Sequence, residues 1–180
     1  MNVIITGFGP FGDIEENPSS VLAEGLGKQL NCEVHSNIPV SVECVEKLHD
    51  RIFCANQFIG VHLGVNAKST SIAIELVAVN EVLDEFENVQ VIESDGPRNL
   101  RTPFESILRQ WVSAHPHVTI SEDAGRYLCN FIYYKSLRAG VRCVFVHVPK
   151  LEVLEEDYQL KTLADMVQYL VTNEPGSTTE

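Results

Sequence analysis

Short apolar runs alternate with amphipathic segments along most of the chain. A run such as VRCVFVHV at 141–148 predicts a buried strand, because strands covered on both faces are almost continuously hydrophobic. The predicted strands are 2–6, 32–40, 58–63, 117–121 and 141–148, with a further apolar and extended segment at 71–79.

Between the strands, apolar side chains recur every three or four residues, which is the spacing of one helix face. The predicted helices are 18–30, 41–55, 103–115, 125–137 and 157–172. Asn17 is a candidate N-cap for the first helix, since Pro18 suits the first helical position. Residues 80–101 are acidic and rich in turn formers, so we expect a surface excursion there, part strand and part loop.

This alternation predicts an α/β fold with a mostly parallel, twisted sheet and helices on both faces, a three-layer sandwich. The 180 residues suit a single domain over 1–173, followed by a polar tail at 174–180. In such folds, ligands bind at the edge of the sheet where the parallel strands end.

Unusual residues follow the ends of the predicted strands. A glycine-rich loop follows the first strand, and the segment 64–70 follows the third. Cys129 comes after the strand HVTIS, and His147 ends the strand VFVHV. We therefore expect these groups to converge on one edge of the sheet.

The balance of charge narrows the possible partners. The chain carries 13 basic against 25 acidic residues, a formal net charge of −12. Nucleic acids and anionic membranes bind clustered Lys and Arg, so neither partner is expected. The apolar runs are too short to cross a bilayer and the N-terminal segment lacks the features of a signal peptide, so a cytoplasmic protein is expected.

Cysteine spacing indicates neither a disulfide framework nor a zinc site. The cysteines are Cys32, Cys44, Cys54, Cys129 and Cys143, and no two of them form a CxxC pair. Cys129 differs from the others because it stands near the predicted start of a helix. The positive end of a helix favours the thiolate, which is the nucleophilic form. The alternative is a buried structural cysteine.

His147 lies inside the apolar run VFVHVP, where an imidazole must be hydrogen-bonded or its burial is costly. It is a candidate general base, the alternative being a core histidine with satisfied hydrogen bonds. His62 also ends a predicted strand and is the main rival for this role.

Glu75 stands alone within the apolar segment SIAIELVAV. A carboxylate there needs a partner or an open cleft, unless the alternation of strand faces turns it to solvent. Together, Glu75, Cys129 and His147 supply the set that cysteine hydrolases use. In that set the imidazole activates the thiol, and the carboxylate orients the imidazole.

The loop GFGPFG at 7–12 has the GxGxxG spacing of a dinucleotide-binding fingerprint. Pro10 removes a backbone N–H where phosphates would be held, and DIEEN separates the last glycine from the helix. A nucleotide-dependent oxidoreductase is therefore disfavoured. Phe8 and Phe11 suit the walls of a pocket for a small neutral group, or else they are core side chains.

At these residues the sequence resembles pyroglutamyl-peptidase I, the cysteine peptidase family that removes N-terminal pyroglutamate from peptides. The SEDAGRYLCNFIYYKSL block is close to the cysteine motif of this family, in the form that animal members carry. The other matching segments are TGFGPFG at 6–12 with Asn17-Pro18-Ser19, IELVAVN at 74–80 and FVHVP at 145–149.

The resemblance implies a thiol protease without a cofactor, acting on small peptides with an N-terminal L-pyroglutamyl residue. It implies Cys129 as nucleophile, His147 as base and Glu75 as the group that orients His147. The residues that it places near the pyroglutamyl ring are Phe8, Phe11, Asn17 and Leu128. We expect a monomer or a weak homo-oligomer.

Three segments depart from the family pattern. Ser20 stands where Trp is usual, 64–69 lacks the Gln and Gly-Gly-Arg of bacterial members, and 80–101 lacks their Asp-Ala-Arg stretch. The alternative hypothesis is therefore a catalytically impaired member that binds pyroglutamyl-blocked peptide N-termini.

Overall fold

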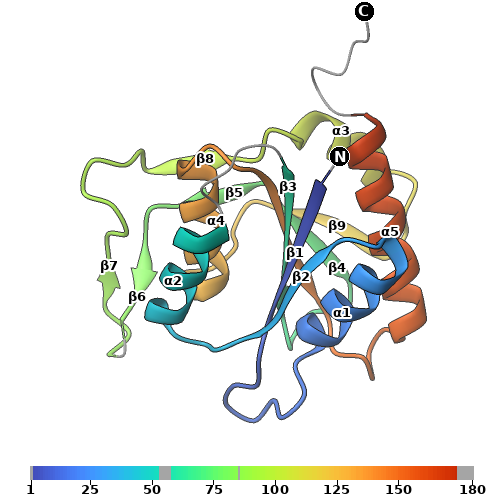
Figure 1. The fold of residues 1–180 in the computed structure, drawn as a ribbon, viewed down its shortest axis with the longest axis horizontal. Helices are drawn as coiled ribbons and strands as arrows, with labels where there is room; N and C mark the ends of the chain where they lie inside the picture. Colours follow the sequence, from blue (N-terminus) through green and yellow to red (C-terminus); the bar gives the residue numbers. More distant parts are fainter. Residues whose placement is uncertain (1, 53–57, 85, 174–180) are drawn as a thin grey trace, which may run out of the picture.

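The computed structural model describes residues 2–52, 58–84 and 86–173. Within them, the centre of the fold is a six-stranded sheet in the order β2-β1-β3-β10-β4-β9 (Figure 1). Its strands are β1 (Asn2–Phe8), β2 (Glu33–Ile38), β3 (Phe58–Val65), β4 (Ile72–Glu75), β9 (Val118–Ser121) and β10 (Arg142–Val148). Strands β1, β2, β3 and β10 are parallel, whereas β4 and β9 run in the opposite direction.

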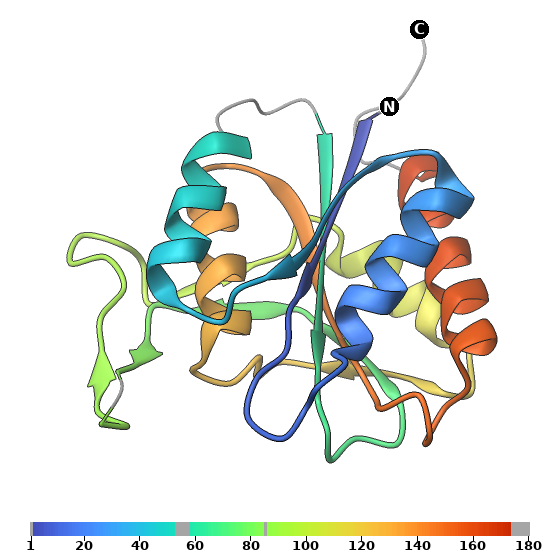
Figure 2. The ribbon, with the colours of Figure 1, turned by 60° about the horizontal axis from the view of Figure 1, so that its bottom comes forward.

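Helices cover both faces of the sheet, as Figures 1 and 2 show. One face carries α1 (Pro18–Leu30), α3 (Glu105–Val112) and α5 (Glu156–Thr172), and α1 and α3 each pack against α5. The opposite face carries α2 (Val42–Ile52) and α4 (Leu128–Arg138). The predicted three-layer α/β architecture with a mostly parallel sheet is confirmed.

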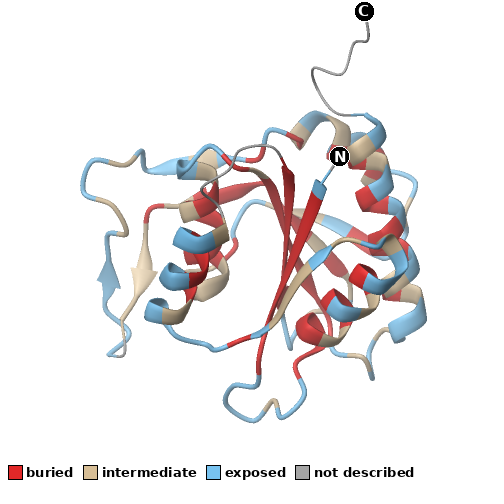
Figure 3. Cartoon of the chain, viewed as in Figure 1, coloured by how far each residue is buried: buried red, intermediate tan, exposed pale blue. Residues whose placement is uncertain are grey.

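The middle strands are buried on both faces, which explains their continuous hydrophobicity (Figure 3). In β10, Val144 and Val146 belong to the core under α1 and α5, whereas Cys143 and Phe145 belong to the core under α4. Full burial of such a side chain contributes about 1.5–3 kcal/mol. This period-two alternation places His147 on the α4 face of the sheet.

The apolar segment 71–79 is divided at Leu76 into β4 and β5 (Val77–Val79). Strand β5 pairs with β8 (Asn99–Arg101), and β6 (Val82–Leu83) pairs with β7 (Val89–Gln90). These small sheets lie beside α4 (Figure 1), and the prediction of an excursion that is part strand and part loop is confirmed.

The direction of β9 corrects one step of the sequence analysis. Because β9 is antiparallel to β10, its last residue, Ser121, lies level with Glu75 and not at the edge where β10 ends. The chain then returns over 122–127 to that edge, where α4 begins at Leu128, later than the predicted Gly125. Cys129 therefore reaches the expected edge through a loop, because an alternation of strands and helices does not specify the direction of each strand.

Two predicted boundaries fall outside the described residues. The predicted helix 41–55 is α2 up to Ile52, and its last residues are not described. The polar tail at 174–180 also lies outside the described residues. Among the described helices, none combines the length and the hydrophobicity that crossing a membrane requires.

Candidate active site

Cys129 is the second residue of α4 and lies in the first turn of the helix. The preceding loop turns at Gly125, whose φ of 78° suits glycine, and Asp123 accepts the Gly125 N–H at 3.1 Å. Asp123 also pairs with Arg126 at 2.7 Å, which fixes the approach to the helix. The thiol consequently lies among first-turn N–H groups that have no acceptors within the helix and carry its positive charge.

Space for the thiol comes from Gly64, near the end of β3. A Cβ at Gly64 would lie 2.7 Å from Cys129 Sγ and 2.6 Å from the Phe145 ring, closer than real Cβ contacts. The sequence analysis did not select Gly64 as a site residue. A glycine inside an apolar strand is nevertheless a signal of close approach by another group.

His147 and Glu75 come from the adjacent strands β10 and β4. His147 Nδ1 lies 2.7 Å from Glu75 Oε1, and the exposed fractions of the two residues are 9% and 2%. Glu75 is therefore not on a solvent face, which excludes the alternative considered for it. Because Nδ1 is bound to Glu75, Nε2 is left for the side-chain hydrogen bond that His147 makes with Cys129.

The surroundings of His147 determine its charge. Burial by itself lowers the pKa of His147, but the hydrogen bonds to Cys129 and Glu75 outweigh burial and raise the pKa to about 9. The imidazolium is therefore the favoured form at neutral pH, next to a carboxylate and a thiol. An imidazolium beside a cysteine is the arrangement that activates a thiolate nucleophile.

His62, the rival base, lies in a different environment. It is fully buried, with Nδ1 2.8 Å from Thr6 Oγ1 and Nε2 3.1 Å from Ser136 Oγ. Burial, with a smaller effect from His49, lowers the pKa of His62 to about 3. His62 is thus a neutral core histidine held by hydroxyl groups, and it does not line the pocket that contains Cys129.

A cavity of about 320 Å³ opens beside Cys129 and His147. Its wall includes every candidate ring-binding residue of the sequence analysis, while Glu75 lies behind His147. The residues that line it are Phe8, Phe11, Asn17, Val40, Val65, Ala124, Tyr127, Leu128, Cys129 and His147. Phe8 is buried and Phe11 is 42% exposed, so the two phenylalanines form an inner wall and a rim.

Four lining residues were missed, namely Val40, Val65, Ala124 and Tyr127. Val65 ends β3 and Val40 follows β2, so both occupy the edge at which the site was expected. Tyr127 precedes α4 and is 62% exposed, which is unusual for an aromatic side chain and marks the rim of the pocket.

Asn17 organises the loop between β1 and α1. It is the N-cap of α1, as predicted, and its Oδ1 accepts the Ser19 N–H at 3.0 Å and the Ser19 hydroxyl at 2.8 Å. Its Nδ2 donates to the Gly9 carbonyl at 2.9 Å. The small side chain of Ser20 accepts the Asn37 N–H at 3.0 Å, which binds the first turn of α1 to the end of β2.

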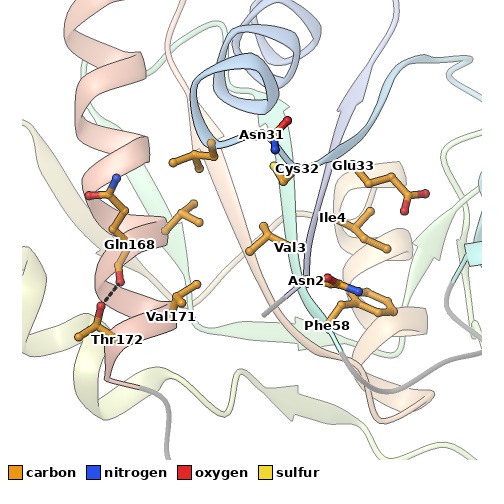
Figure 4. Close-up of a pocket in the computed structure, with 12 residues that line it drawn as sticks. Asn2, Val3, Ile4, Asn31, Cys32, Glu33, Phe58, Gln168, Val171 and Thr172 are labelled. Atoms are coloured by element: carbon orange, nitrogen blue, oxygen red, sulfur yellow. Dashed lines mark hydrogen bonds between the residues drawn. The ribbon is translucent and has the colours of Figure 1, made fainter.

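A larger groove of about 720 Å³ lies at the opposite edge of the sheet, where β1, β2 and β3 begin (Figure 4). It is lined by Val3, Cys32, Phe58 and the last turn of α5, among others. Burial raises the pKa of Cys32, so that thiol is kept protonated. Within the described residues, no cluster of three or more His, Cys, Asp or Glu could hold a metal ion.

The chain is similar in sequence to a known protein family and to its members. Residues 1–161 match the family model described as pyroglutamyl peptidase. Pyroglutamyl-peptidase 1 of Rattus norvegicus is 33% identical over 166 residues, which cover 83% of this chain and 79% of that protein.

Solved structures share the fold. The pyrrolidone carboxyl peptidase of Fervidobacterium islandicum is similar with a TM-score of 0.76 and 25% identity, covering 96% of this chain and 98% of that one. A mutant pyrrolidone carboxyl peptidase from Pyrococcus furiosus has a TM-score of 0.78 at 24% identity, covering 97% and 100% of the two chains. The second likeness concerns the fold alone.

Proposed function

The chain belongs to the pyroglutamyl peptidase family, a family of cysteine peptidases, and we propose that it hydrolyses the bond after an N-terminal L-pyroglutamyl residue of small peptides. The observation that carries this proposal is the chain of hydrogen bonds from Glu75 through His147 to Cys129, in which His147 and Cys129 line a small apolar pocket and Glu75 lies behind His147. A thiol, an imidazole and a carboxylate in this order form the catalytic unit of a cysteine hydrolase.

In the first half of the reaction, the Cys129 thiolate attacks the pyroglutamyl carbonyl carbon. A C–S bond forms and the carbonyl oxygen takes up the negative charge, which the first-turn N–H groups of α4 stabilise. The His147 imidazolium gives its proton to the leaving amine as the C–N bond breaks. The products of this half are a thioester on Cys129 and the shortened peptide.

In the second half, neutral His147 removes a proton from water, and the resulting hydroxide attacks the thioester carbon. The C–S bond then breaks, which releases pyroglutamate and restores the thiolate and the imidazolium. Glu75 keeps the His147 ring oriented through Nδ1 and stabilises its positive charge in both halves.

The pocket suits a small neutral ring. Phe8 and Phe11 supply apolar walls, and the side chain of Asn17 organises the loop by bonding to Gly9 and Ser19. We expect the lactam N–H and C=O to pair with a few backbone or amide groups of the pocket. A prolyl amine or a glutamyl carboxylate would bring an unpaired charge into this pocket, so both residues should be rejected.

Cys129→Ser is the decisive test. Turnover of a fluorogenic pyroglutamyl amide should fall by about 10⁴-fold or more, because an unactivated hydroxyl replaces the thiolate. Cys44→Ser, at a free cysteine of α2, is the matched control and should keep full activity. Iodoacetamide should inactivate the wild type, and substrate should protect it.

Wild-type activity in Cys129→Ala would overturn the proposal. Binding of pyroglutamyl peptides by the wild type without turnover would instead favour the second function, a module that recognises blocked N-termini. A cytoplasmic location and a monomer or weak homo-oligomer remain predictions from the sequence.

A further inference from the structure

Helix α4 is attached to the rest of the molecule by directed hydrogen bonds as well as by apolar packing. Asn130, directly after the nucleophile, is fully buried. Its Oδ1 accepts the Val79 N–H at 2.8 Å, and its Nδ2 donates to the carbonyls of Val79 at 2.9 Å and Glu81 at 2.8 Å. The amide group thus binds the first turn of α4 to the last residue of β5 and to the backbone just after it.

Tyr133, one turn further along α4, makes the second attachment. It is also fully buried, and its hydroxyl donates to the main-chain carbonyl of Glu75 at 2.9 Å. The helix is therefore fixed to both ends of the segment that runs from Glu75 to Glu81.

These attachments connect the two halves of the candidate catalytic unit. Cys129 belongs to α4, whereas Glu75 and its partner His147 belong to β4 and β10. Apolar packing is non-directional, so the contacts of Phe131 and Ile132 define the axial position of the helix less sharply than directed bonds do. Hydrogen bonds depend on distance and angle, so they fix the axial position of the helix.

We propose that Asn130 and Tyr133 are positioning residues that hold the Cys129 thiol in register with the Glu75–His147 pair. The inference rests on the proposed function. The thiol also lies within a narrow space beside Gly64, so a shift of α4 displaces Sγ from His147. A misplacement of about 1 Å costs roughly 10²-fold in rate.

The chain provides a matched control for each residue. Tyr134 is equally buried, and its hydroxyl donates to the Pro97 carbonyl at 2.8 Å. Asn80 makes the same set of bonds as Asn130, accepting the Glu93 N–H at 2.8 Å and donating to the carbonyls of Glu93 at 2.7 Å and Gly96 at 3.2 Å. Both control side chains hydrogen-bond to the segment 93–97, and these bonds do not involve Glu75.

The first measurement compares Tyr133→Phe with Tyr134→Phe, since each variant loses one buried hydroxyl and keeps its ring. Thermal denaturation should show a loss of stability in both, and a larger one in Tyr133→Phe because its hydroxyl also hydrogen-bonds to the Thr102 side chain. In Tyr133→Phe, kcat for a pyroglutamyl amide should fall roughly 10- to 100-fold with KM nearly unchanged. In Tyr134→Phe, kcat should stay within about threefold of the wild type.

The second measurement is the pH profile of kcat/KM. The groups that raise the pKa of His147 are Cys129 and Glu75, against the effect of burial. Withdrawal of the thiol removes one of them, so the alkaline limb should move to lower pH in Tyr133→Phe and in Asn130→Ala. It should not move in Tyr134→Phe or Asn80→Ala, and a purely structural role would leave all four profiles alike.

Equal kcat values and equal pH profiles for Tyr133→Phe and Tyr134→Phe would overturn the inference, whether or not the asparagine variants fold. Cys129→Ala, assayed in parallel, separates this failure from that of the proposed function. An active Cys129→Ala would overturn the function itself, whereas an inactive one beside matching tyrosine variants would overturn the positioning role alone.

Discussion

The surroundings of His62 and those of His147 are adjacent regions of the α4 face of the sheet. They shift the pKa of an imidazole in opposite directions. The two residues lie on the paired strands β3 and β10, with the Phe145 ring centroid 6.4 Å from one imidazole and 4.9 Å from the other. Both side chains are buried. Burial lowers the pKa of His62 to about 3, and its hydroxyl partners carry no charge that would offset burial. Burial also disfavours the charged form of His147, but there the thiol of Cys129 and the carboxylate of Glu75 outweigh it and raise the pKa to about 9. Because both histidines are buried, the difference between them comes from the chemistry of their partners.

Replacing each of the two histidines in turn is the most severe test of this comparison. His147→Ala should lower kcat/KM by about 10⁵-fold, because removing one member of a catalytic unit costs nearly as much rate as removing all of its members. His62→Gln keeps hydrogen-bonding groups near Thr6 and Ser136, so it should lose stability but stay within about fivefold of wild-type kcat/KM. Steady-state kinetics of the folded variants checks both values. Equal losses of kcat/KM in the two variants would mean that His62 is again a candidate for the base.

Removing the charge beside His147 should give the next largest effect. Glu75→Gln keeps the shape of the side chain but removes its negative charge, so kcat/KM should fall by roughly 10³-fold, less than in His147→Ala. The pKa of His147 should also fall, because Glu75 is one of the partners that raise it. The alkaline limb of the pH–rate profile measures this shift. A larger loss than in His147→Ala would indicate a structural glutamate.

The space opposite His147 provides a third test, since Gly64 is the residue of β3 that pairs with it. Gly64→Ala places a Cβ against the Cys129 thiol, and kcat/KM should fall by about 10²-fold. Gly60→Ala is the control on the same strand, because its Cβ would lie 3.0 Å from that of the inert, buried Cys143. The control should lose stability and keep its activity. Equal kcat/KM in both variants would contradict the role given to Gly64.

The smallest effect concerns the pH dependence of stability. His62 has a pKa of about 3 in the folded chain and an ordinary value of 6.5 when unfolded, so the unfolded state takes up a proton first as pH falls. Stability present above pH 6.5 is therefore lost as the pH falls towards 3. Between pH 7 and pH 5 the loss from this residue is about 2 kcal/mol.

Urea denaturation at both pH values checks this expectation. His62→Gln has no proton to take up at this position, so its stability should fall less between pH 7 and pH 5 than that of the wild type, by about 2 kcal/mol. The same pH dependence in the wild type and in His62→Gln would show that His62 is not held neutral by the fold.

Much of this architecture follows from local patterns in the sequence. Periodicity identified the strands and helices of the central layers, and the Asn17-Pro18 pair identified the start of α1. These features depend on residues close together in the chain. The choice between His62 and His147 does not, because both residues lie in apolar strands and their partners are distant in sequence.

The partners show why the sequence left that choice open. Glu75 is 72 positions from His147, and Ser136 is 74 positions from His62. The reversed direction of β9, the break at Leu76 and the pocket residues Val40 and Tyr127 depend in the same way on packing between distant segments. The resemblance to a family supplied the expected roles of Cys129 and His147, which the residues alone left open.

The position of β10 between β3 and β4 has a consequence for how the protein is made. The chain finishes β3 and β4 long before it reaches β10, so in a growing polypeptide both strands present an unpaired edge that can bind other chains. Insertion of β10 closes this gap and brings His147 to Glu75 and Cys129 in the same step. The Cys129 thiol consequently gains its proposed base only when the sheet is complete, so we expect a partly synthesised chain to lack the activated nucleophile.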